Sequence, residues 1–162
     1  MKLLNTVSWL VILVVLAPFI AFAAGNYLPQ FDGFAVTGGS MEPEIKTGAL
    51  LFTQNVPADQ IQVGDTITFS DGDHYTTHEV IGVESSNGET LFRTQGTANN
   101  SPDPGTVTED ELQGKKLFSI PFLGYFIVWA GTLQGLLILV VLPGLLLIAS
   151  EATSLFRELK ES

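Results

Sequence analysis

The sequence has no cysteine and few basic residues, and each absence excludes a class of function. Without cysteine the chain has no disulfide, no thiol nucleophile and no thiolate ligand for a metal. Its 7 lysines and arginines stand against 17 aspartates and glutamates, for a formal net charge of −10. A nucleic acid partner is therefore not expected, because phosphates are bound mainly through Lys and Arg.

Charged residues are also absent from two long runs, 3–24 and 117–150. A bilayer core about 30 Å thick needs about 20 apolar residues for one helix, so each run is long enough to cross a membrane. The first run has an alternative interpretation as a cleavable secretory signal, since Ala21-Phe22-Ala23 resembles an A-x-A cleavage site. Its length exceeds the apolar core of a typical signal, which favours an uncleaved anchor.

The second run is too long for one helix and begins with a stretch that contains Pro and Gly. This stretch, 118–124, is typical of a strand or an interfacial segment, and the helix proper is predicted over 131–150, with Pro143 as a candidate kink. The predicted organisation is a transmembrane helix at 1–24, an extracytoplasmic domain at 25–130, a second transmembrane helix at 131–150 and a cytoplasmic tail at 151–162.

The basic residues that flank the two runs set the predicted topology. Lys2 precedes the first run, and Arg157 and Lys160 follow the second. Because cytoplasmic flanks are enriched in Lys and Arg, we expect both termini in the cytoplasm and the acidic domain outside the cell membrane.

The segment between the two runs is predicted to be mainly β. Short alternating or β-branched runs are bounded by turn signals, and Asp71-Gly72 and Asn87-Gly88 are tight hairpin signals. The predicted strands cover 34–36, 49–52, 65–69, 75–83 and 90–94. The last three follow one another through short turns and should form an antiparallel meander. No helix is predicted within this domain.

Three residues in this segment have side chains suited to acyl transfer. Ser40 follows two glycines, which let the backbone turn sharply and a substrate approach closely. His78, on a predicted strand, is a natural general base near pH 7. Asp103 stands between two prolines that fix its backbone. Each residue also has an ordinary structural interpretation: a capped glycine turn, a surface or core histidine, and a loop aspartate that caps its own turn.

Taken in order, four segments resemble the sequence boxes of type I signal peptidases. Gly38-Gly39-Ser40-Met41-Glu42-Pro43 resembles the serine box, whose hallmark is Ser-Met-x-Pro, and 63–69 is similar to the next box, a Gly-Asp turn leading into a strand. The segment 77–81 resembles the archaeal and endoplasmic-reticulum branch, in which His replaces the Lys base of the bacterial branch. The segment 96–104 is similar to that branch's Gly-Asp-x-Asn…Asp-Pro box.

The resemblance implies a signal-peptidase-like antiparallel β domain flanked by two transmembrane helices. It implies a membrane-bound serine endopeptidase that removes signal peptides from secreted preproteins through an acyl-enzyme and cuts after small residues. In this scheme Ser40 is the nucleophile, His78 its general base and Asp103 the group that orients His78. The implied partners are preprotein signal peptides, the lipid bilayer and the secretion translocon.

The resemblance also implies where the substrate is held. The backbone of Gly39 and Ser40 would form the oxyanion hole, and Met41 and Pro43 would contact the substrate.

No cofactor and no metal are expected. The two histidines of the chain, His74 beside the predicted hairpin turn and His78, are four residues apart along extended backbone and would lie about 13 Å apart, too far to share a metal ion.

Three positions depart from the family pattern. Thr97 replaces the first acid of the last box, Glu79 follows His78 where Arg is common, and Gly38 stands where the bacterial branch has a serine. If position 97 faces the imidazole, Thr97→Asp should supply a second carboxylate there. These departures leave open a catalytically degenerate, signal-peptidase-like membrane protein that binds or assembles. A third interpretation is an unrelated structural β domain on a membrane hairpin.

Overall fold

The computed structural model describes residues 9, 13, 30–86 and 88–161. The predicted N-terminal transmembrane helix at 1–24 lies outside the described residues, except for Trp9 and Leu13, which are helical and exposed. The chain divides into two compact units: a β domain, Ala24–Tyr125, and a second unit that contains Phe126–Ser162.

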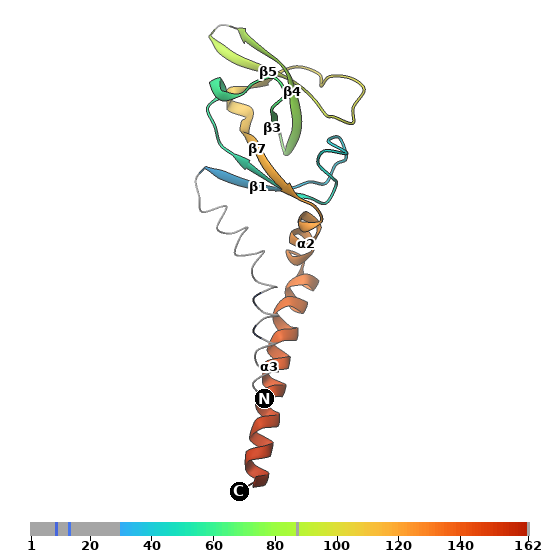
Figure 1. Ribbon diagram of the computed structural model, residues 1–162, viewed down its shortest axis with the longest axis vertical. Helices are drawn as coiled ribbons and strands as arrows, with labels where there is room; N and C mark the ends of the chain where they lie inside the picture. The colour runs from blue at the N-terminus through green and yellow to red at the C-terminus, as the bar shows by residue number, and fades with distance from the viewer. Residues whose placement is uncertain (1–8, 10–12, 14–29, 87, 162) are drawn as a thin grey trace. The chain divides into compact units, whose positions relative to one another are not determined.

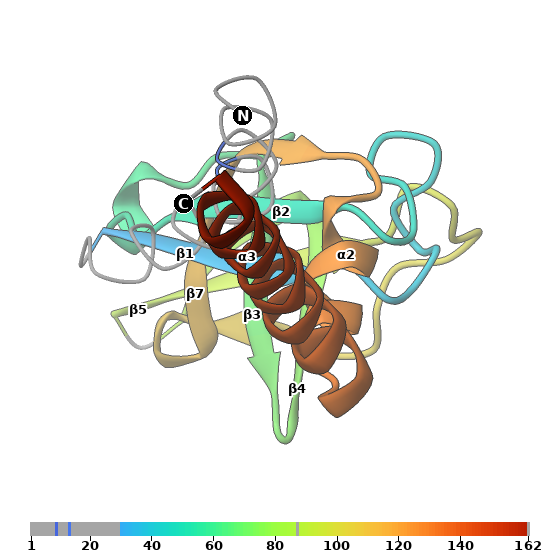
Figure 2. The ribbon, with the colours of Figure 1, turned by 90° about the horizontal axis from the view of Figure 1, so that it is seen from below.

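The β domain is built on one antiparallel sheet of seven strands in the order β1-β2-β7-β3-β4-β5-β6 (Figure 1). The strands are β1 (Phe31–Ala35), β2 (Leu50–Gln54), β3 (Thr66–Asp71), β4 (His74–Ser86), β5 (Glu89–Gln95), β6 (Val107–Thr108) and β7 (Leu112–Ile120). Figure 2 shows β1 and β2 crossing β3 and β4 at steep angles, as expected for a strongly twisted sheet. The domain is therefore mainly β, as predicted.

The predicted meander is present as β3, β4 and β5. Asp71 pairs with His74, and Ser86 pairs with Glu89, so each connection is a two-residue hairpin. The first hairpin loop is Gly72–Asp73, one residue later than the predicted signal, and Gly72 adopts φ 67°, which favours glycine.

β6 was not predicted, and of β7 only the end, 118–120, lies in the segment predicted to be a strand or an interfacial segment. β7 lies between β2 and β3 in the sheet. Gly114 makes this position possible, because a Cβ there would lie 2.8 Å from the carbonyl oxygen of Gln54. The pairing of β7 shifts register against both neighbours.

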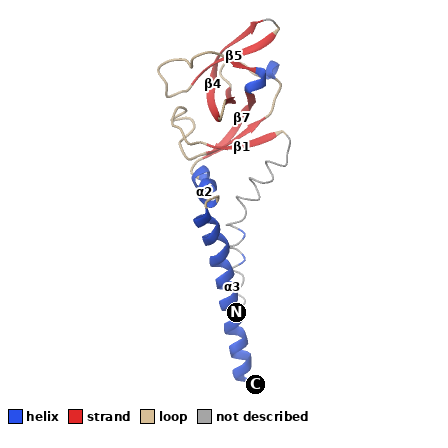
Figure 3. Ribbon diagram, turned by 180° about the vertical axis from the view of Figure 1, so that it is seen from behind, coloured by secondary structure: helices blue, strands red, loops and turns tan. Residues whose placement is uncertain are grey.

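The predicted strand or interfacial segment at 118–124 is divided between two elements. β7 ends at Ile120, and helix α2 (Leu123–Ala130) begins three residues later. The domain also contains two short 3₁₀ helices that periodicity did not reveal, η1 (Ala58–Gln60) and η2 (Glu109–Glu111). Figure 3 shows that strands make up the rest of the domain's regular structure.

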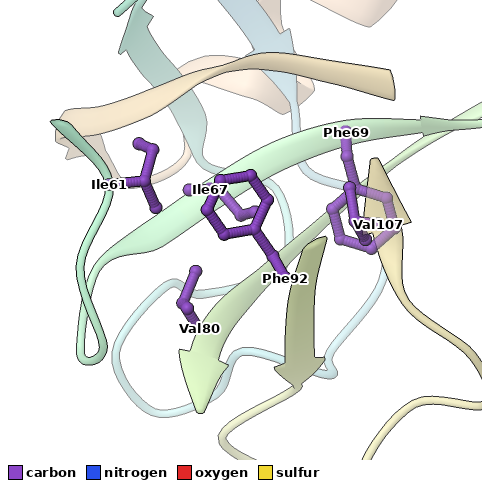
Figure 4. Close-up of a cluster of buried hydrophobic side chains, with 6 residues drawn as sticks. All are labelled: Ile61, Ile67, Phe69, Val80, Phe92 and Val107. Atoms are coloured by element: carbon purple, nitrogen blue, oxygen red, sulfur yellow. The ribbon is translucent and has the colours of Figure 1, made fainter. Parts of the chain in front are cut away.

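Two hydrophobic clusters fill the domain. The larger contains Phe92 and the side chains around it, which converge from β3, β4, β5, β6 and the loop before β3 (Figure 4). The members of this cluster are Ile61, Ile67, Phe69, Val80, Phe92 and Val107. The smaller consists of Met41, Ile45, Ala49 and Leu51. Because Met41 and Ile45 belong to the loop between β1 and β2, the smaller cluster fixes the loop that carries Ser40.

The second unit contains helix α3, Leu133–Glu161, which follows α2 after a short break. Helix α3 continues past Ser150, the predicted end of the helix proper, into the charged tail. The membrane span over 131–150 and the cytoplasmic tail at 151–162 stay predictions. Thr132 caps the start of α3, where its hydroxyl oxygen accepts a hydrogen bond from the Gly135 N–H at 3.1 Å.

Helices α2 and α3 cover the predicted membrane span at 131–150 and the residues just before it. Among the described residues, no single helix is both long and apolar enough to cross a bilayer. The pair Leu123–Ala130 and Leu133–Leu145 meets the requirement only when taken together, and it is bent by 86° at its break.

Candidate active site

Ser40 lies in the loop between β1 and β2, where packing on both sides fixes its backbone. The next residue, Met41, is 2% exposed and belongs to the smaller hydrophobic cluster. The Ser40 carbonyl oxygen accepts a hydrogen bond from the Ala98 N–H at 2.8 Å. The serine is thus held between a core side chain and a second loop.

The carboxylate of Glu42 closes the serine loop. It accepts hydrogen bonds from the backbone N–H of Thr47 at 3.2 Å and from the Thr47 hydroxyl at 3.0 Å. These bonds, the backbone one foremost, lower the pKa of Glu42 below its ordinary value. Glu44, two residues on, forms an ion pair with Lys116 of β7. The loop is therefore tied to itself and to the sheet.

His78 stands on β4 opposite Ile67 of β3, and it is only 6% exposed. Its Nε2 atom lies 2.9 Å from the Oγ atom of Ser40, and its Nδ1 atom lies 2.5 Å from Oδ2 of Asp103. The ring of Phe69 meets the imidazole edge-on, with centroids 6.3 Å apart. The imidazole therefore lies between the hydroxyl and the carboxylate, inside a mostly buried environment.

Asp103 reaches His78 from the loop that follows β5. Its backbone N–H donates to the carbonyl oxygen of Thr94 at 2.9 Å, and its Oδ2 atom accepts a hydrogen bond from the Thr94 hydroxyl at 2.7 Å. The side chain of Asp103 is 21% exposed. The structure thus brings together Ser40, His78 and Asp103, which are distant in sequence.

Gly96 is a site residue that the sequence did not single out. A Cβ at this position would lie 2.6 Å from the carbonyl oxygen of Ser40 and 2.9 Å from Nε2 of His78. Only glycine lets this loop approach so closely, and the signal that could have revealed it was its place at the start of the last sequence box. Thr97, next in the chain, points its hydroxyl at the sulfur of Met41, 3.8 Å away.

A cavity of about 500 Å³ opens beside Ser40, between β1 and the start of β4. β1 is the first strand of the sheet, and β4 pairs with β5 only from Glu79 onward. Both walls therefore have strand edges without a partner strand in the described part of the chain. The rings of Phe34 and Tyr75 meet between these walls with centroids 5.0 Å apart.

The residues predicted to hold the substrate are placed differently around this cavity. Met41 and Ser40 line it, and Met41 does so from the hydrophobic cluster. Gly39 and Pro43 are exposed and do not belong to its wall. His74 also lines the cavity, near the hairpin turn, and a second cavity of about 320 Å³ contacts His78 and Asp103.

This arrangement is suited to one type of chemistry. A serine hydroxyl within hydrogen-bond distance of an imidazole, with a carboxylate on the other ring nitrogen, is the arrangement that activates serine for attack on a carbonyl. The neighbouring cavity, with its strand edges, has the form of a site for an extended peptide. The fold and the site together define a candidate serine hydrolase of peptides.

Comparison with known proteins narrows this class. No family model matches the chain. The sequence is 27% identical over 124 residues to signal peptidase I W of Bacillus subtilis (strain 168), a match that covers 71% of this chain and 65% of that protein. It is 39% identical over 99 residues to the signal peptidase complex catalytic subunit SEC11C of Homo sapiens and of Mus musculus, covering 55% of this chain and 52% of each relative.

The matches cover only part of each relative. The chain spans 65% of the length of the bacterial relative and 52% of the length of the human one. One relative is bacterial and the others are eukaryotic, and all are named as signal peptidases or their catalytic subunits. Their similarity to this chain supports its assignment to the signal peptidase family and suggests a peptidase.

Proposed function

We propose that this protein is a membrane-bound serine endopeptidase of the Ser-His type that removes N-terminal signal peptides from secreted preproteins. The observation that carries the proposal is the contact between Ser40 Oγ and His78 Nε2 at 2.9 Å, with Asp103 on the opposite ring nitrogen. The similarity to signal peptidases supplies the substrate class.

The catalytic steps follow from these contacts. His78 takes the proton of Ser40 through Nε2 as the hydroxyl attacks the scissile carbonyl, and it then returns this proton to the leaving amine. The signal peptide remains as an ester on Ser40. His78 next deprotonates a water molecule, which hydrolyses the ester. Asp103 holds the Nδ1–H of His78 and stabilises the imidazolium formed at each step. The N–H groups of Ser40 and Gly39 are proposed to stabilise the oxyanion.

The cavity beside Ser40 supports recognition of the substrate as an extended strand. A peptide inserted there would form main-chain hydrogen bonds with the edge of β1 or with the start of β4, whatever its sequence. Alternate side chains of a strand share a face, so the first and third residues before the cut bond would both point to the same wall. Met41 and Ile45 line this cavity and would restrict these residues to small side chains. Pro43, outside the cavity, stays a prediction as a substrate contact.

Apolar side chains support a membrane location. In the β domain Phe118, Phe122 and Tyr125 are exposed, and in the helical unit Trp129 is 39% exposed at the end of α2. Aromatic side chains of this kind favour the interface of a bilayer. We propose that the helical unit and the N-terminal run anchor the protein in the cell membrane. Both termini would then be cytoplasmic, the β domain outside, and the secretion translocon nearby.

The alternative of a degenerate binding protein depends on the loss of an acid at Thr97. The Thr97 hydroxyl contacts Met41, whereas Nδ1 of His78 is paired with Asp103. Loss of the acid therefore does not deprive His78 of its carboxylate, and the peptidase is the function that these contacts favour.

Substrate substitution tests the proposal. Purified full-length protein in detergent should cleave a preprotein that has alanine at the first and third positions before the bond, and sequencing of the product should place the cut there. Tryptophan at either position should lower the cleavage rate by about tenfold to a hundredfold, since overpacking costs about 1–3 kcal/mol.

Tryptophan at the second position is the matched control for this experiment. Its side chain would point away from the wall, so cleavage should continue at the same bond. Equal cleavage of all the variants, or a cut at unrelated bonds, would contradict the proposed specificity.

A further inference from the structure

Thr94 makes a contact that the steps above do not use. It lies on β5 opposite Val80 of β4, and it is 2% exposed. Its hydroxyl donates a 2.7 Å hydrogen bond to Oδ2 of Asp103, and the same oxygen faces Nδ1 of His78. The two groups therefore meet at one carboxylate oxygen.

The direction of this bond follows from the chemistry of the carboxylate. An ionised carboxylate can only accept hydrogen bonds, so the Thr94 hydroxyl is the donor. The backbone of the same two residues is also joined, because the Asp103 N–H donates to the Thr94 carbonyl oxygen at 2.9 Å. Asp103 is thus attached to a buried strand at its main chain and at its side chain, although it belongs to a loop.

Two other buried threonines of the sheet have different hydroxyl contacts from Thr94. The hydroxyl of Thr68 is bonded to that of Thr77 at 2.8 Å rather than to a carboxylate. Thr53 of β2 is fully buried, and its hydroxyl has no hydrogen-bond partner within the described structure. Of these three buried threonines, Thr94 is the one whose hydroxyl binds a carboxylate among the described contacts, and it does so at the residue that orients His78.

We propose that Thr94 is a positioning residue that holds the Asp103 carboxylate toward His78 and so extends the Ser40–His78–Asp103 arrangement by a fourth member. The proposal rests on the proposed function for its effect on turnover. Without the hydroxyl, the carboxylate loses a donor and is free to rotate away from Nδ1. Thr94 acts only through Asp103, and it does not line the cavity beside Ser40.

Thr94→Val tests the proposal, because valine keeps the shape of threonine and the backbone bond to Asp103 while it removes the donor. We expect kcat for preprotein cleavage to fall by about tenfold to a hundredfold, the effect of losing one hydrogen bond to a charged group. KM should stay within about twofold, because the interaction acts on the chemical step rather than on binding. Thr94→Ser, which keeps the hydroxyl, should recover most of the loss.

Thr53→Val is the matched control, since it makes the same chemical change at a buried strand threonine without a partner. It should leave kcat unchanged. In an Asp103→Asn background, Thr94→Val should cause little further loss, because residues that act as a unit are not additive. If Thr94→Val does not melt cooperatively, Thr94→Ala replaces it under the same expectations.

A spectroscopic measurement separates this proposal from the proposed function. The chain has 2 histidines, so in protein labelled with ¹⁵N-histidine the Nδ1–H proton of His78 can be assigned by its absence in His78→Ala. Thr94→Val should shift or broaden this resonance, Thr94→Ser should restore it, and Thr53→Val should leave it in place. This result is expected whether or not the preprotein is cleaved. An unshifted resonance, or a kcat of Thr94→Val within about twofold of wild type, would overturn the role of Thr94.

Discussion

Replacement of His78 by alanine is expected to lower the turnover of preprotein cleavage by roughly 10⁶-fold, the loss associated with removing the base of a serine triad. The reason is the position of Nε2, 2.9 Å from the Ser40 hydroxyl. A serine hydroxyl is a weak nucleophile at neutral pH unless a base takes its proton. Single-turnover cleavage by purified variants in detergent measures this loss, and a melting curve shows whether the buried site still folds.

His74 provides the comparison for this experiment. It is exposed and lines the cavity beside Ser40, but the Ser40 hydroxyl is bonded to His78. His74→Ala should therefore change KM more than kcat, since it alters the wall of the cavity and leaves the base in place. If His74→Ala reduced kcat more than His78→Ala, the assignment of the base would be wrong.

Asp103→Asn should lower turnover by roughly 10⁴-fold, as the same exchange does in a serine triad. The carboxylate accepts the Nδ1–H of His78 and stabilises the imidazolium, whereas an amide can present its NH₂ group and hold the wrong tautomer. The fold should be retained, because the backbone bond from Asp103 to Thr94 does not depend on the side chain. Single-turnover kinetics again provide the measurement.

A second variant shows whether another carboxylate can replace Asp103. The sequence suggested that Thr97→Asp would supply one if position 97 faced the imidazole. The structure directs the Thr97 hydroxyl to the sulfur of Met41 instead, so we expect Thr97→Asp not to rescue Asp103→Asn. A loss below about fivefold for Asp103→Asn, close to 1 kcal/mol, would leave a Ser40–His78 dyad without a third member.

The parts of the fold that the sequence predicted are those determined by local interactions. β3, β4 and β5 are joined by two-residue hairpins, and alternation and turn residues identify such neighbours directly. Most of β7 was missed because its partners β2 and β3 are distant in sequence, and because it carries two consecutive lysines. Both lysines form ion pairs, Lys115 with Asp65 at 2.7 Å and Lys116 with Glu44, so charge did not prevent a central strand.

The helix after the domain shows a different limit of sequence analysis. The predicted end near Ser150 followed from the first charged residues, because the expected length was that of a bilayer. The tail that follows is rich in Glu, Leu, Lys and Arg, which favour helix in water as well, and α3 continues to Glu161. Hydrophobicity predicts where a membrane span ends, but it does not predict where the helix ends.

For the site, motifs identified the residues that carry chemistry but not those that position them. Ser40, His78 and Asp103 were singled out by residue type and by the resemblance of their surroundings to signal peptidase boxes. Gly96 and Thr94 gain their roles only when the loop after β5 folds back against Ser40 and His78. The place of Gly96 at the start of the last sequence box was a signal for that residue, whereas no local pattern in the sequence indicates the role of Thr94, which only the folded chain reveals.

The most direct test of the central claim is the rate of preprotein cleavage by Ser40→Ala measured beside wild type and Ser101→Ala. Ser101 is exposed in the loop that precedes Asp103, so its loss controls for removal of a serine hydroxyl near the site. We predict that wild type and Ser101→Ala cleave the preprotein at similar rates. Ser40→Ala, folded and solubilised in detergent, should show no cleavage above background. Cleavage by Ser40→Ala at the wild-type rate would contradict the assignment of Ser40 as the nucleophile.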